Sequence, residues 1–406
     1  MSLKKYQILC IIVACFSISS CSIFRTLKAM KSGSVEKGVE YTTKFEVVGK
    51  LILLKVKING GDKEYDFIFD TGAVTAIDKK LAKELNLVPI SKVEAKDASN
   101  TTDTVKVFKL DHIQLGDILE KDIGVVAIDL DFVNKMLDRH IDGIIGNNFF
   151  KFFKITINYQ DHTLALSNKT EAVKSVAGGY VINFWQDMQN SFAPKIKCEI
   201  KPGLVMDGVI DSGCEGTICV PSGKIKKGEL LQSNANIEAQ GTMSAGAFGK
   251  NTKDYMLRVN DFSIDSLHVS NLLVTNTPGK VCLIGSDFLS QFVVTINYPA
   301  HQLILVPIKS QNFPHNSYSL GFGAIKSDSG YFKVIGIWNS SPADSAGIKL
   351  NDKITEINTT KTEKISGNDF YKMVSNDSTS EYNLVIVSKG IERNILLKKR
   401  MLLKQP

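Results

Sequence analysis

Short runs rich in Val, Ile, Leu and Phe occur along most of the chain, and Gly, Asn or Asp separates one run from the next. Runs of this length between turn residues are typical of β strands. Leu51–Ile58 and Phe192–Ile200 are two examples. Helical spacing of apolar residues replaces this pattern at Asp78–Leu87, and Pro89 is expected to end that helix. The pattern therefore predicts a mainly β protein.

The pattern also repeats itself once. The segment Phe152–Leu166 returns as Gln291–Leu305, with an identical Thr-Ile-Asn-Tyr core at an offset of 139 residues (295 − 156). Just upstream, Ile144–Phe150 returns as Leu283–Leu289 at the same offset. A repeat of this length predicts two related β lobes, at residues 41–170 and 171–310, and two copies are too few for a solenoid.

An aspartate follows an apolar strand at the same place in each copy. The two segments are Asp70-Thr71-Gly72-Ala73 and Asp211-Ser212-Gly213-Cys214, offset by 141 residues (211 − 70). Two lobes related by a pseudo-two-fold axis would bring these carboxylates face to face, where like charges share a proton. One carboxylate can then take a proton from water while its partner donates one to a carbonyl oxygen.

Composition and charge narrow the classes of function. A hydrophobic content of 43% suits folded domains, and the net charge of +7 is spread along the 406 residues. The Lys-rich segments are short, so no nucleic-acid partner is expected. The chain has neither zinc-type Cys and His spacing nor a glycine-rich phosphate loop after a strand. We expect no cofactor and no metal.

The N-terminus has the pattern of an export signal. Lys4 and Lys5 precede an apolar run that ends at Ile18-Ser19-Ser20-Cys21. This end resembles a bacterial lipobox, which implies a signal peptide at residues 1–21 and lipidation of Cys21. The alternative is an ordinary signal peptide with a chance cysteine. Acyl chains on Cys21 would hold the protein on a cell-envelope membrane, with the periplasmic side favoured, and residues 22–40 would form a tether.

Four cysteines remain in the proposed mature chain: Cys198, Cys214, Cys219 and Cys282. An exported protein could pair them in three ways. Free buried thiols are the other interpretation.

Residues 41–310 resemble bilobal, pepsin-like aspartic proteases with retropepsin-like motifs. The resemblance implies two β-barrel-like lobes that form one cleft, with Asp70 and Asp211 as the catalytic pair. It implies an endopeptidase that acts on protein or peptide substrates as a monomer. The residues expected to support the catalytic turns are Thr71, Gly72, Ala73, Ser212, Gly213, Cys214, Gly146 and Gly285.

The chain departs from the pepsin pattern in two respects. No tyrosine lies at the predicted hairpin tip Asp97–Asn100, so either this hairpin or the one around Gly241–Gly249 could cover the substrate. Ala73 and Cys214 stand where pepsins place a hydroxyl that can bind the ionised aspartate. Losing that hydrogen bond raises the pKa of the pair, which predicts activity at a less acidic pH than that of stomach-type enzymes.

The remaining residues, 311–406, resemble a PDZ domain of the kind attached to bacterial proteases. Leu320, Gly321 and Phe322 match its carboxylate-binding loop, and Gly367–Ser375 matches its groove helix. The resemblance implies a module that binds peptide C-termini or regulates access to the protease, and a module that only packs on its neighbour is the alternative.

The other functions considered are a non-catalytic peptide-binding adaptor, a precursor that cuts itself within Ser22–Val39, and a Cys214 nucleophile.

Overall fold

The computed structural model describes residues 22–187, 191–226, 230, 236–246, 249, 253–313, 317–375 and 380–403. Strands make up 49% of the chain and helices 14%, so the predicted mainly β fold is confirmed. Within these ranges no helix is long and apolar enough to cross a membrane. The predicted signal segment and Cys21 lie outside the described residues.

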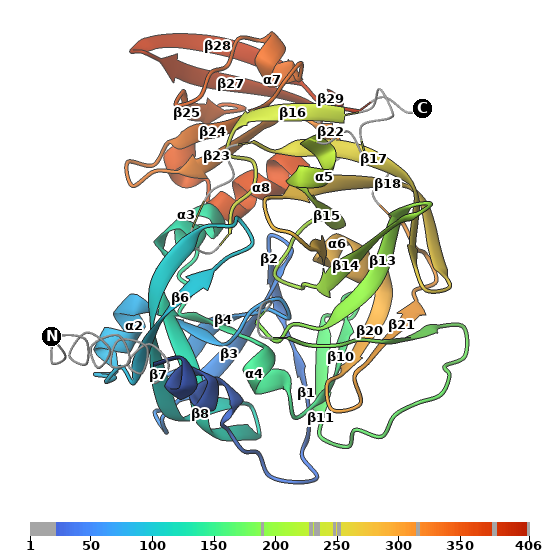
Figure 1. The fold of residues 1–406 in the computed structure, drawn as a ribbon. Coiled ribbons are helices and arrows are strands. Elements are labelled where there is room, and N and C mark those ends of the chain that lie inside the picture. Colours follow the sequence, from blue (N-terminus) through green and yellow to red (C-terminus); the bar gives the residue numbers. More distant parts are fainter. Residues whose placement is uncertain are drawn as a thin grey trace, which may run out of the picture.

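The first lobe is built on an eight-stranded sheet (Figure 1). In spatial order its strands are β2 (Glu46–Val48), β3 (Leu51–Ile58), β4 (Tyr65–Phe69), β9 (Gly143–Ile145), β5 (Ala76–Asp78), β8 (Ile118–Ile128), β7 (Thr102–Leu115) and β6 (Ser91–Lys96). Its helices are α2 (Lys79–Glu84), α3 (Asp131–Leu137) and α4 (Asn147–Phe150). The predicted helix is confirmed as α2, whose first turn is capped because Asp78 accepts a bond from the Lys80 backbone N–H. Its predicted end is wrong, because α2 stops at Glu84 and the chain turns at Asn86 (φ 52°), before Pro89 is reached.

The second lobe repeats this arrangement. Its strands, in spatial order, are β13 (Lys195–Lys201), β14 (Leu204–Ile210), β19 (Cys282–Ile284), β15 (Ile218–Pro221), β18 (Leu267–Thr277), β17 (Tyr255–Ile264) and β16 (Asn236–Gly241). Its helices are α5 (Ser222–Lys226) and α6 (Ser286–Leu289). The short strand β19 runs parallel to β14, as β9 runs parallel to β4 in the first lobe.

A six-stranded sheet joins the two lobes. Its order is β1 (Glu40–Lys44), β11 (Thr163–Ser167), β10 (Lys154–Asn158), β20 (Phe292–Asn297), β21 (Gln302–Pro307) and β12 (Tyr180–Asn183). Thr156 and Thr295, the equivalent residues of the sequence repeat, are paired directly, and their Oγ1 atoms lie 2.8 Å apart. Direct pairing of a residue with its equivalent in the other copy of the repeat marks the position of the pseudo-two-fold axis. One buried apolar cluster, which includes Phe67, Phe149 and Phe288, extends through both lobes.

Residues 317–403 form what is called here the C-terminal module, with an apolar core of its own. Its elements are β22 (Tyr318–Ser319), β23 (Phe322–Lys326), β24 (Phe332–Trp338), α7 (Pro342–Ser345), β25 (Lys353–Ile357), β26 (Thr360–Lys361), η2 (Thr362–Lys364), α8 (Gly367–Ser375), β27 (Glu381–Ser388), β28 (Ile391–Lys398) and β29 (Arg400–Met401). The core includes a stacked pair, Phe332 and Phe370, with ring centroids 4.2 Å apart. The predicted helix at Gly367–Ser375 is confirmed as α8.

The segment after Cys21 differs from the predicted tether. Residues 22–31 form a helix, and Ala29 and Met30 are buried against the first lobe. Further contacts fix the chain just beyond, since the Ser34 backbone pairs with Lys121. The sequence prediction missed this helix because its apolar residues form no clear periodic stripe. Burial of two side chains against an existing sheet is enough to order such a segment.

Candidate active site

The two Asp turns lie at equivalent points of the two lobes. Asp70 follows β4, and its backbone N–H donates to the Ile145 carbonyl at 3.0 Å. Asp211 follows β14, and its backbone N–H donates to the Ile284 carbonyl, also at 3.0 Å. Each aspartate is therefore held at the end of a strand by the short parallel strand beside it, which fixes where its carboxylate points.

The structure brings the two carboxylates together. Oδ1 of Asp70 accepts from the Gly72 N–H at 2.7 Å, and Oδ1 of Asp211 accepts from the Gly213 N–H at 3.0 Å. Each glycine also faces the other lobe, because a Cβ on Gly72 would lie 2.6 Å from Cγ of Asp211. A Cβ on Gly213 would lie 2.4 Å from Oδ2 of Asp70. Glycine is required here because the opposite carboxylate occupies the space of a side chain.

Thr71 and Ser212 connect the turns beneath the carboxylates. The Thr71 N–H donates to Oγ of Ser212 at 3.1 Å, and the Ser212 N–H donates to Oγ1 of Thr71 at 3.0 Å. Each hydroxyl then donates across the axis to a carbonyl oxygen of the other lobe, Thr71 to Ile210 and Ser212 to Phe69. All four groups are buried, so this reciprocal arrangement fixes the separation of the turns.

Gly146 and Gly285 lie directly behind the two turns. A Cβ on Gly146 would be 2.4 Å from the Ala73 carbonyl oxygen, and one on Gly285 would be 2.2 Å from the Gly216 carbonyl oxygen. The residue after each glycine donates its N–H to the turn, Asn147 to Ala73 at 2.8 Å and Ser286 to Cys214 at 2.7 Å. The backbone of each segment therefore supports a turn at a distance that admits no side chain.

The electrostatics of the pair favour a shared proton. Burial raises the pKa of Asp70, although the Gly72 N–H opposes that shift. Burial, followed by the negative charge of Asp70, raises the pKa of Asp211 well above its ordinary value. Two desolvated carboxylates that face each other across the two glycines do not ionise together readily, so the proton belongs to the pair.

One cysteine pair lies beside the second turn, where the Sγ atoms of Cys214 and Cys219 are 3.3 Å apart. The Cys198 thiol donates to the Met206 carbonyl oxygen at 3.7 Å, and the Cys282 thiol donates to Sδ of the same methionine at 3.9 Å. All four thiols are free in the structure. Cys214 is directed at Cys219, and no histidine hydrogen-bonds to it within the described residues.

Three supporting residues were not predicted from the sequence. The Tyr298 hydroxyl donates to Oδ1 of Asn147 at 2.8 Å, and Nδ2 of Asn147 donates to the Ala73 carbonyl. Asn148 accepts the Thr75 N–H at 2.7 Å. The signal was present in the repeat, because Tyr298 ends the Thr-Ile-Asn-Tyr core and the asparagines follow Gly146 directly. The contacts that these residues make, of which the one between Tyr298 and Asn147 crosses between the lobes, could not be read from the sequence.

The two predicted hairpins meet each other. The first has its tip at residues 97–100, between β6 and β7, as expected. The Gly249 N–H of the second donates to Oδ2 of Asp97 at 3.1 Å, and Oγ1 of Thr277 donates to the Ala98 carbonyl at 2.9 Å. Ala247 and Phe248 of the second hairpin lie outside the described residues.

Leu320, Gly321 and Phe322 form a buried turn at the start of β23. Gly321 has φ +89°, a conformation that favours glycine, and its N–H donates to Oγ of Ser319 at 3.0 Å. The Leu320 and Phe322 side chains belong to the core of the C-terminal module. No group of three or more His, Cys, Asp or Glu side chains is placed to bind a metal in the described part of the chain.

No curated protein matches the chain. The segment that carries Asp70, Gly72 and Gly146 can nevertheless be placed by its sequence. Residues 54–149 match the model of the aspartyl protease family. The match lies within the first lobe, and its counterpart in the second lobe is the internal repeat that carries Asp211. Residues 54–149 are thus similar to aspartyl proteases.

Proposed function

We propose that this chain is an aspartic-type endopeptidase whose catalytic pair is Asp70 and Asp211. The observation that carries the proposal is the reciprocal packing of the two turns, in which each aspartate fills the space above the glycine of the other lobe. The aspartyl protease match of the first lobe supports the same reaction class. Because both turns come from one chain, a monomer supplies one complete site.

The reaction follows from a pair that holds one proton. A water molecule between the carboxylates loses its proton to the ionised aspartate while its oxygen bonds to the peptide carbonyl carbon. The protonated aspartate donates its proton to the carbonyl oxygen. Transfer of a proton to the amide nitrogen then allows the C–N bond to break, which releases an amine and a carboxylic acid. Because the titration belongs to the pair, neither aspartate has a fixed role.

Two further elements of the proposal rest on sequence patterns. A lipid on Cys21 anchors the protein to a cell-envelope membrane, with the periplasmic side favoured. The C-terminal module, which resembles a PDZ domain, binds the C-termini of peptides next to β23 or regulates access to the cleft. The helix at residues 22–31 packs on the first lobe, which supports a position of the protease lobes close to the lipid anchor.

Cleavage of an unfolded casein substrate by the wild type, Asp70→Asn and Asp211→Asn tests the catalytic proposal. Each variant should lose activity by at least about a hundredfold, because general acid–base catalysis contributes that much or more. A pepstatin-type inhibitor should block the wild type. Equal cleavage by all three proteins would overturn the proposal, and no cleavage at any pH without inhibitor binding would favour the non-catalytic adaptor.

A further inference from the structure

A helix of the first lobe packs against the C-terminal module. Within the described residues, β23 pairs only with β24, so its other edge is the one to which an incoming peptide strand would add. Helix α3 contacts both β23 and α8, the two elements beside which an incoming peptide would lie (Figure 1). A helix that covers a strand edge prevents another strand from pairing there. Peptide docking beside β23 therefore requires α3 and the module to separate.

Asp138, the residue after α3, makes the principal polar contact with the module. Its Oδ2 accepts from the Gly367 N–H, at the N-terminus of α8, at 2.7 Å, and lies 3.5 Å from Nζ of Lys326. Negative charge is favourable at a helix N-terminus, and this carboxylate is only 34% exposed. The neighbouring ion pair of Lys135 with Asp328 is far more exposed and is expected to contribute little.

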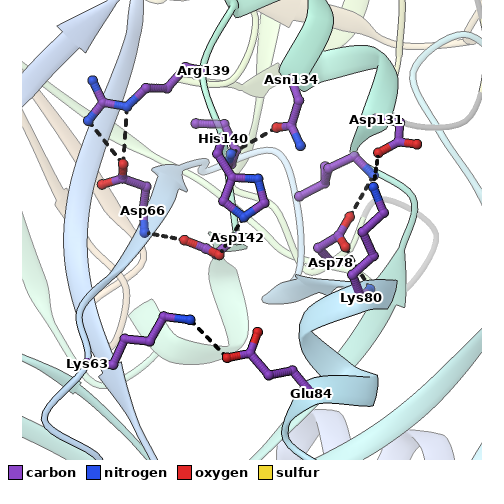
Figure 2. A network of polar contacts seen from close by, with 12 residues as sticks. Lys63, Asp66, Asp78, Lys80, Glu84, Asp131, Asn134, Arg139, His140 and Asp142 are labelled. Carbon is purple, nitrogen blue, oxygen red and sulfur yellow. Dashed lines mark hydrogen bonds and ion pairs between the residues drawn. The ribbon is translucent and has the colours of Figure 1, made fainter.

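Helix α3 is itself fixed to the first lobe, as Figure 2 shows. Asp131 at its start pairs with Lys80 at 2.6 Å. Beyond its end, Arg139 pairs with Asp66 at 3.0 Å, and Asn134 accepts the Ile141 N–H. The exposed Asp131–Lys80 pair contributes little by itself, but Leu130 and Leu137 at the two ends of α3 are buried in the first lobe. Helix α3 therefore moves with the lobe, so separation at this contact means that the module moves.

On its other side the module is joined to the second lobe through a shared strand. The first half of β16 pairs with β17, and its second half pairs with β24, with Ala239 opposite Trp338 and Gly241 opposite Gly336. The Thr242 N–H continues the ladder to the Ile335 carbonyl at 2.7 Å. Because β24 lies between β23 and β16, a displacement of β23 reaches β16 through main-chain hydrogen bonds.

We propose that the C-terminal module clamps the two lobes together, with α3 as the internal occupant of its peptide-docking edge, so that a captured peptide displaces α3 and shifts β16. The inference rests on the proposed peptide-docking role of the module and makes that role regulatory rather than one of substrate recruitment. The resting protein is the clamped form, and release of α3 frees the strand that precedes the second hairpin.

Two variants weaken the clamp from opposite sides. Asp138→Gly removes the carboxylate and keeps the left-handed backbone of this residue (φ 48°), whereas Lys326→Met changes only the module. Asp328→Asn, which removes the exposed ion pair, is the matched control. Amide hydrogen exchange is measured in all three full-length proteins, in β23 and in β16.

Asp138→Gly and Lys326→Met should raise exchange about five- to twentyfold in β23 and β16 together, as expected for loss of a charge-assisted bond. Asp328→Asn should leave both strands within about twofold of the wild type. Casein cleavage should rise in the same two variants. Unchanged exchange in β23 would show that α3 does not cover this edge, and a rise in β23 alone would overturn the coupling to β16. Inactivity of every protein would count against the protease proposal and leave the exchange result intact.

Discussion

Thr71 and Ser212 exchange hydrogen bonds across the axis between the lobes, each backbone N–H donating to the hydroxyl oxygen of the other residue, at 3.1 and 3.0 Å. The two residues are buried and lie at equivalent positions of the sequence repeat. The separation of the two aspartates thus depends on hydroxyls from both lobes. A change in either hydroxyl should affect both stability and the proposed chemistry.

Thr71→Val should destabilise the protein by about 1–3 kcal/mol, because the buried Ser212 N–H loses its acceptor and the Ile210 carbonyl loses a donor. Thr71→Ser keeps the hydroxyl and is the matched control. Urea denaturation measures the difference, and kcat of casein cleavage should fall in the valine variant alone. Equal stability of the two variants would contradict the structural role of the hydroxyl.

Because the pKa of Asp211 is raised, the free energy of unfolding should fall as the pH rises. Between the two pKa values the folded protein holds a proton on Asp211 that the unfolded chain has released. The stabilisation that Asp211 contributes is therefore at its full value below the ordinary pKa of aspartate. It is lost as the pH rises through the raised value. Asp211→Asn should therefore raise Tm near pH 7, by about 2–4 °C for each kcal/mol regained, and should match the wild type at about pH 3. A Tm of Asp211→Asn below that of the wild type at neutral pH would contradict this prediction.

Glu120 provides a second test, away from the aspartate pair. It is fully buried beneath Gly33, and neither carboxylate oxygen has a hydrogen-bond partner among the described residues. Burial raises the pKa of Glu120 to about 9. The nearby charge of Lys151 opposes this shift, and burial lowers the pKa of Lys151.

Wild-type stability should consequently decline from about pH 4.5 to about pH 9, and Glu120→Gln should remove most of that decline. Thermal unfolding across this range measures it. The exposed Glu94→Gln is the control and should follow the wild type. Parallel curves for all three proteins would show that Glu120 ionises normally.

Gly146→Ala and Gly285→Ala should each destabilise the chain by about 3 kcal/mol or more. In both, the new Cβ would meet a carbonyl oxygen of the supported turn at 2.4 or 2.2 Å, and backbone relaxes less than side chains do. Gly223→Ala meets no described atom within 4 Å and should remain within about 0.5 kcal/mol of the wild type. Chemical denaturation compares the three. Tolerance of alanine at Gly146 and Gly285 would mean that the turns can shift without cost.

The structure selects one of the three cysteine pairings. A disulfide needs Sγ atoms about 2.05 Å apart, so Cys214 and Cys219 must approach by only about 1.2 Å from their separation of 3.3 Å. Oxidised glutathione should link Cys214 to Cys219 and Cys198 to Cys282, with release of two reduced glutathione molecules per bond. Peptide mass mapping with and without reductant identifies the pairs. In Cys214→Ser, Cys219 should remain available for alkylation, and a Cys198–Cys219 link would contradict the prediction.

Elements that depend on the local order of residues could be predicted from the sequence. Alternating apolar runs predicted the strands, Asp78 and the helical spacing after it predicted α2, and the repeat predicted two lobes with one aspartate turn each. These features were readable because strand periodicity, caps and turns are properties of neighbouring residues. The helix at residues 22–31 was missed because tertiary burial of Ala29 and Met30, and not periodicity, stabilises it.

Contacts between residues far apart in the sequence became known only from the folded chain. The exchange between Thr71 and Ser212, the support of Ala73 by Asn147, and the contact of Asp138 with α8 each join segments more than 70 residues apart. Such contacts depend on how lobes and module pack, and packing responds to the whole buried surface. The residues at these points were visible in the chain, but their partners were a consequence of the fold.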